Sequence, residues 1–201
     1  FQDSPAGVRL FGTRANNRYQ YNLGVFRRIE KDANSGLNDV TMGRAFRDDD
    51  FAVANLYVQD WPVLGFTTQG TVVYNRNREG DEVFTDSNKV IQRPSSLGLG
   101  RGSDYDVGYV GLNGDGHFGR WNLTASLYGA VGKVDRGLFV NQSEDIRAGF
   151  TAFELSRDYS WARVRLSLAY ATADKDPFDD RAEGFDAIFE NPQFAGADTS
   201  F

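Results

Sequence analysis

The stretch RWNLTASLYGAVG, from Arg120 to Gly132, decides the fold. Apolar side chains occupy every second position from Trp121 to Val131, and polar side chains fill the alternate positions from Asn122 to Tyr128. Because successive side chains of a β-strand point to opposite faces, this period of two places one apolar and one polar face on a single strand. The apolar face suits lipid or a core, and the other face suits water.

The same alternation recurs along the chain. Val164 to Tyr170 alternate with Arg163, Arg165, Ser167 and Ala169, and a matching pattern covers Tyr19 to Phe26. Most candidate strands hold about ten to thirteen residues, more than the usual five or six of a globular strand but close to the nine to eleven that cross a bilayer at a tilt. Eight strands are predicted over one domain, residues 1–201: 7–14, 18–28, 50–60, 64–76, 104–114, 120–132, 145–157 and 161–172.

The connections between these strands alternate strictly between short and long. Short ones lie at 15–17, 61–63, 115–119 and 159–160, and long ones at 29–49, 77–103, 133–144 and from 173 onward. An antiparallel meander gives this order when its two ends face different compartments, as in outer-membrane barrels with short periplasmic turns and long extracellular loops. The order predicts an all-β, antiparallel, up-and-down transmembrane β-barrel.

The composition agrees with this fold class. The chain has 22 Gly, 9 Tyr and 16 Phe but one Met, which favours strands and turns. Its mean hydropathy of -0.49 fits barrel strands, which average to mild polarity, and no run approaches the roughly 18 apolar residues of a spanning helix. A net charge of -6 argues against nucleic acid as a partner, and the lack of cysteine excludes disulfides and cysteine-based metal sites.

Tryptophans mark the ends of the candidate strands. Trp121 and Trp161 each follow a short turn directly, and Trp61 lies in one. Aromatic side chains at strand ends are typical of the girdle where a barrel meets lipid headgroups. The alternative is that they are core tryptophans of a β-sandwich, and the alternating loop lengths favour the girdle.

The last part of the chain carries a resemblance to a known family. The segment Tyr170–Phe201, with the element Phe185-Asp186-Ala187-Ile188-Phe189, resembles the strand-then-loop passage of the alginate export family of outer-membrane barrels. GVRLFG at 7–12 and NNRYQYNLGVF at 16–26 are similar to large barrels of this kind, whereas Asn191-Pro192 departs from the family. Because such barrels have many more strands, the resemblance implies that these residues are part of a larger barrel. Since the chain starts at Phe1, we expect that a leader has been removed or that the sequence begins within a longer protein.

Arginines supply the candidate functional site. The alternation and the loop order place five of them in the lumen: Arg9, Arg28, Arg147, Arg163 and Arg165. Inward guanidinium groups favour anions because their charge is permanent and they pair with carboxylates in bidentate fashion. We therefore expect a porin or export channel in the bacterial outer membrane that passes an anionic polysaccharide or organic acids. The alternative is that lumenal acids such as Asp106 neutralise these arginines, which then only brace the wall.

Other functions remain open as alternatives. One is a sheath barrel that surrounds a partner protein, in the lumen or periplasm, without conducting; another is a soluble carbohydrate-binding β-sandwich. Acidic runs such as Asp48-Asp49-Asp50 follow no calcium-loop spacing and are interpreted as solvated loop charge. His117 is the only histidine and has no local nucleophile motif, so no enzyme activity, catalytic residue, metal or cofactor is predicted.

Overall fold

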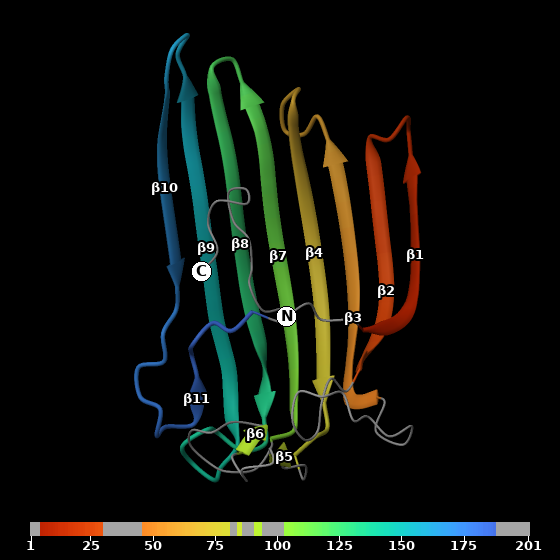
Figure 1. Ribbon diagram of the computed structural model, residues 1–201, viewed down its shortest axis with the longest axis vertical. Helices are drawn as coiled ribbons and strands as arrows, with labels where there is room; N and C mark the ends of the chain where they lie inside the picture. The colour runs from red at the N-terminus through yellow and green to blue at the C-terminus, as the bar shows by residue number, and fades with distance from the viewer. Residues whose placement is uncertain (1–4, 30–45, 81–83, 86–90, 94–102, 188–201) are drawn as a thin grey trace.

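The protein is described by a computed structural model over residues 5–29, 46–80, 84–85, 91–93 and 103–187. Eight long strands form an antiparallel meander in which each strand pairs with the next long strand along the chain (Figure 1). None of the described residues lies in a helix that could cross a membrane. The long strands are β1 (Ala6–Arg14), β2 (Tyr19–Ile29), β3 (Phe46–Gln59), β4 (Phe66–Asn77), β7 (Tyr105–Phe118), β8 (Trp121–Val134), β9 (Glu144–Asp158) and β10 (Arg163–Ala171).

The tight turns all lie at one end of the sheet and the long connections at the other (Figure 1). In the first turn Ala15, Asn16 and Asn17 have φ of 51°, 52° and 67°, a region that asparagine tolerates better than most residues. The turn between β7 and β8 is two residues long, and Gly119 with φ of 64° supplies its left-handed position. The predicted alternation of short and long connections is confirmed.

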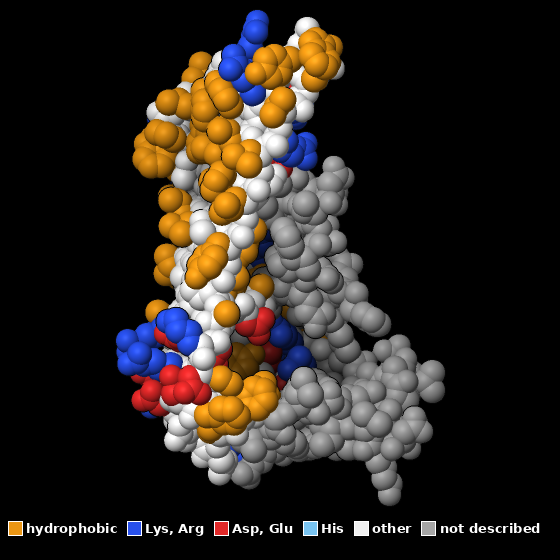
Figure 2. Space-filling view, turned by 90° about the vertical axis from the view of Figure 1, so that its left-hand side faces the viewer, with side chains coloured by type: hydrophobic (Ala, Val, Ile, Leu, Met, Phe, Trp, Pro, Cys, Tyr) orange, Lys and Arg blue, Asp and Glu red, His pale blue; other side chains and the backbone are white. Residues whose placement is uncertain are grey.

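The outer face of the sheet is apolar and open. We define it as the face that carries Leu127 and Val131, which are 57% and 63% exposed. The register carries this face through every long strand, and Figure 2 shows hydrophobic side chains along the length of the sheet. Exposed hydrophobic residues on it include Val8, Leu10, Leu23, Val25, Val72, Val110, Leu112, Val164, Leu166, Leu168 and Tyr170. An exposed apolar patch of this extent is typical of an interaction surface, either with another protein or with a membrane.

The inner face is polar toward the short turns, and toward the long connections it combines buried apolar residues with buried polar ones such as Asp49 and Asn75. Near the turns it carries residues such as Gln69, Asn113 and Ser126, which lie on one cross-strand row. The core lies further along this face and contains Phe51, Val73, Val107, Ala130 and Ala152, all buried. Phe51 and Val53 also point to the inner face, opposite Asn75 and Val73 of β4.

The strand predictions are confirmed in number, with shifted ends. β3 begins four residues before the predicted 50, and β7 runs to Phe118, so that the predicted turn at 115–119 shrinks to two residues. Three short elements were not predicted: β5 (Phe84–Thr85) pairs with β6 (Ile91–Arg93), and β11 (Arg181–Ala182) pairs in parallel with the start of β9. Among the described residues β1 and β10 do not pair with each other, so the sheet is open.

Candidate functional site

The chain after β10 returns onto the inner face at the end of the long connections. We call residues 182–187 the return segment. The hydroxyl of Thr172 donates to the carbonyl of Glu183 at 2.6 Å, and the amide of Phe185 donates to the carbonyl of Thr172 at 2.9 Å. The Phe185 ring then stacks on Phe150, with centroids 5.5 Å apart, and meets the Tyr109 ring edge-on at 6.4 Å. These contacts fix the segment against β7 and β9.

A cavity of about 270 Å³, which we call the inner pocket, lies between the return segment and the sheet. Small apolar residues such as Ala130 and Ala148 form its floor. Its polar lining comes from both sides: Arg28, Asn75, Tyr105 and Tyr109 from the sheet, and Asp186 from the return segment. A guanidinium, an amide, two phenols and a carboxylate can donate to and accept from hydroxyl and carboxylate groups.

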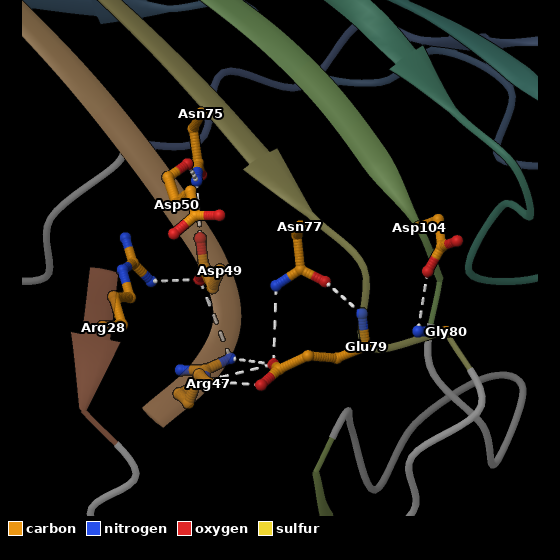
Figure 3. A network of polar contacts seen from close by, with 9 residues as sticks. All are labelled: Arg28, Arg47, Asp49, Asp50, Asn75, Asn77, Glu79, Gly80 and Asp104. Carbon is orange, nitrogen blue, oxygen red and sulfur yellow. Dashed lines mark hydrogen bonds and ion pairs between the residues drawn. The ribbon is translucent and has the colours of Figure 1, made fainter. Parts of the chain in front are cut away.

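A network of charges, the Asp49 network, borders this pocket (Figure 3). Asp49 is 0% exposed, and its carboxylate accepts a hydrogen bond from the side-chain amide of Asn75 at 2.6 Å. Guanidinium nitrogens of Arg28 and Arg47 lie 3.3 and 3.8 Å from Asp49 Oδ2. Arg47 also donates to Glu79, with Nη2 to Oε2 at 2.5 Å. The network ties β2 and β3 to the chain that follows β4.

Asp49 corrects one interpretation of the sequence. The sequence pattern favours solvated loop charge for the run Asp48-Asp49-Asp50, but all three residues lie within β3. Asp49 faces inward and is fully buried, whereas Asp50 faces outward and pairs with Arg27 at 2.7 Å. The sequence alone does not distinguish the three aspartates, because which of them faces inward depends on the orientation of the strand within the sheet.

Two predicted arginines, Arg163 and Arg165, lie side by side on the inner face of the edge strand β10, near the short turns. Each has an acidic neighbour on β9: Arg163 Nε lies 2.5 Å from Asp158 Oδ1, and Arg165 Nε lies 3.2 Å from Glu154 Oε1. A guanidinium carries five N–H donors, and one carboxylate engages at most two of them. Both arginines therefore keep donors for a further partner.

The other three arginines are dispersed. Arg28 faces inward in the Asp49 network, and Arg9 lies on β1 with its Nε 3.0 Å from Asn22 Oδ1. The inward placement of Arg147 is wrong: it pairs with Val131 on the outer face, and its neighbours Ile146 and Ala148 line the inner pocket. Asp106, the acid expected to neutralise lumenal arginines, also lies on the outer face, where it pairs with Arg78.

The three tryptophans gather at the short-turn end. Trp61, Trp121 and Trp161 are 52%, 39% and 88% exposed, and the guanidinium of Arg157 lies 5.1 Å from the Trp121 ring centroid. None of them belongs to the buried core of the inner face. Their exposure separates them from the buried core of the sheet, and the girdle stays a prediction.

The one histidine, His117, lies away from the inner pocket. His117 lies in β7 near the short turns with its side chain exposed, not in a turn as the sequence pattern indicates. In the part of the chain that the structure describes, no group of three or more metal-ligating side chains is arranged to hold an ion. Sequence reasoning missed Asp49, Tyr109 and Phe185 as neighbours of one pocket, because the return of the chain after β10 leaves no periodic signal.

Comparisons with family models, with curated proteins and with solved structures found no match. The resemblance of Tyr170–Phe201 to the alginate export family therefore stays a prediction from the sequence. Within its motif, Ile188 and Phe189 lie outside the described residues, and Phe185 is the aromatic residue of the return segment.

Proposed function

We propose that this sheet is part of the wall of a β-barrel in the bacterial outer membrane, where it lines a passage for anionic solutes or an anionic polysaccharide. The observation that carries the proposal is the two-faced sheet. Its outer face exposes Leu and Val side chains such as Leu127 and Val131, and its inner face carries polar rows and ion pairs. A barrel wall needs this distribution, because lipid covers one face and water or solute the other.

The height of the apolar face supports the same proposal. On β8 it extends from Trp121 to Val131, and Lys133 follows at the next outward position. The twelve residue steps from Trp121 to Lys133 correspond to about 40 Å along a strand. At the usual barrel tilt of about 35 to 45° this becomes roughly 30 Å along the membrane normal, close to the hydrocarbon thickness of a bilayer.

The preference for anions rests on the inward arginines. Arg163 and Arg165 stand two positions apart on one face, about 6.5 to 7 Å along the strand. A passing carboxylate can move from one guanidinium to the next, and the acids beside them keep each site weak enough to release it.

Among the alternatives, a sheath barrel would hold a partner where the return segment already occupies part of the inner face. A β-sandwich would need a second sheet over the exposed outer face.

Reversal potentials of the full-length protein in planar bilayers test the anion preference. Replacing Arg163 and Arg165 with Gln leaves the carboxylates of Asp158 and Glu154 without partners, so the reversal potential in a salt gradient should shift toward cations. The shift should shrink near 1 M salt, where the Debye length is about 3 Å. The matched variant Asp158→Asn/Glu154→Gln should shift it the opposite way. If neither pair moves the reversal potential of a conducting protein, these residues do not line its passage.

A further inference from the structure

A row of alternating charges crosses the outer face at the end of the long connections. The register aligns one residue from each of the long strands β2, β3, β4, β7, β8 and β9, and then one from β11. The signs alternate without a break along this row. Its members, which we call the charge row, are Arg27, Asp50, Arg76, Asp106, Lys133, Asp145 and Arg181.

The charge row marks the border of the apolar face. Directly on its short-turn side the outward residues include Val25 and Val131, both exposed and apolar. Figure 2 shows Lys, Arg, Asp and Glu side chains clustered at the lower end of the column of hydrophobic side chains, whereas the upper end carries Lys and Arg side chains. In the proposed barrel this end bears the long connections, which places the charge row at the headgroups of the outer leaflet.

The acids of the charge row are engaged within the sheet. Asp50 accepts two hydrogen bonds of 2.7 Å from Arg27. Asp106 accepts one from the Tyr74 hydroxyl at 2.6 Å and another from Arg78. These two carboxylates hold neighbouring cations in place, and the third acid of the row, Asp145, is 53% exposed and lies 3.5 Å from Arg147.

Three cations on the same border are more available. Arg76 and Lys133 are exposed, and neither forms an ion pair with a carboxylate among the described residues. Arg147 lies one outward position from the row on its short-turn side, opposite Val131 and so at the edge of the apolar face; its side chain is 68% exposed and its Nη2 lies 3.5 Å from Asp145 Oδ2. The three lie on β4, β8 and β9, so they span four neighbouring strands of the sheet. Fixed cations at this depth complement phosphate groups of lipid headgroups.

We propose that Arg76, Lys133 and Arg147 bind the phosphate groups of lipid A, the diphosphorylated glycolipid of the outer leaflet. This inference rests on the proposed function, because it requires the outer face to lie in the outer membrane. The apolar face takes the acyl chains, and the cations above it take the phosphates. The occupant is a lipid rather than a protein because the charges border a face that is apolar over the height of a bilayer.

Binding of diphosphorylated lipid A to the full-length protein in neutral detergent tests this site. The variant Arg76→Gln/Lys133→Gln/Arg147→Gln should bind on the order of 100-fold more weakly at low salt, since each cation near an anionic surface contributes about fivefold. The matched control Arg14→Gln/Arg18→Gln/Arg120→Gln removes three exposed cations at the short-turn end and should stay within twofold of the unchanged protein. Dephosphorylated lipid A should bind as weakly to the unchanged protein as diphosphorylated lipid A binds to the first variant.

Equal losses in the two triple variants, an unchanged affinity in the first, or equally tight binding of phosphatidylglycerol would overturn the site. The single variant Lys133→Gln, with about a fivefold loss, provides the same test if the triple variant does not assemble. Recovery of the unchanged protein in the outer-membrane fraction separates the two proposals. If the protein is recovered there and lipid A binding fails, only this inference is wrong; if it is never recovered there, the proposed function is wrong.

Discussion

At the scale of single residues, Asp49 has the most constrained environment that we describe. Its carboxylate is removed from water and lies between the guanidinium groups of Arg28 and Arg47. Burying a charge costs several kcal/mol, which a partner of opposite sign and good hydrogen bonds must offset. Asn75 supplies the hydrogen bond and the two arginines supply the charge.

Substitution of Asp49 should therefore destabilise the protein. Asp49→Asn leaves the guanidinium of Arg28 near a neutral amide, and we expect a loss of about 3 to 5 kcal/mol in the free energy of unfolding. Asp48→Asn is the control, because the Asp48 side chain is 65% exposed; its exposed pair with Arg27 contributes at most about 1 kcal/mol. Urea unfolding from lipid vesicles measures both variants. Equal effects of the two substitutions would contradict the network.

The sequence predicted part of this site. Arg28 was placed inward because β2 alternates cleanly between polar and apolar positions. Arg147 was misplaced because β9 has apolar residues on both faces, with Ile146 and Phe150 inward and Phe153 and Leu155 outward. A strand without a dominant apolar face has no phase that its sequence can define, and only its register with β8 sets it.

At the scale of elements, the return segment covers part of the inner face of the sheet. Phe185 covers Phe150 and Tyr109, so inward apolar residues of β7 and β9 are shielded from water. Strand length, turn spacing and the alternation of strands such as β2, β8 and β10 predicted the eight long strands, although β9 carries apolar residues on both faces. These signals missed β11 and the return segment because two paired residues and an irregular turn carry no period.

Removal of the Phe185 ring should loosen the return segment and widen the passage. In a double-mutant cycle with Phe150→Ala, Phe185→Ala should give a coupling energy of about 0.5 to 1.5 kcal/mol, the usual value for an aromatic pair. Single-channel conductance of Phe185→Ala should rise, because the ring projects onto the inner face. Phe139→Ala is the control, since Phe139 lies in the connection between β8 and β9 and contacts Phe178 instead. A coupling energy near zero would mean that the segment does not depend on this stack.

At the scale of the whole molecule, one open antiparallel sheet separates an apolar surface from a polar one. Tight turns and tryptophans lie at one end, and long connections and the charge row at the other. The sequence predicted the antiparallel strands, their two faces and the separation of tight turns from long connections, because strand length, loop length and period can be read along the chain; it did not predict the charge row. It did not predict which polar side chains would meet, because partners such as Asp49 and Asn75 come from separate strands.

The central claim is that the outer face contacts lipid, and a scan of β8 tests it most directly. Single cysteines at Leu123, Leu127 and Val131 on the outer face and at Asn122, Thr124 and Ser126 on the inner face would carry a fluorophore in vesicles with a quencher on the lipid chains. The account predicts quenching at the three outer positions, strongest at Leu127 near the middle of the bilayer, and none at the inner ones. Equal quenching of both sets, or no quenching at any position, would contradict it.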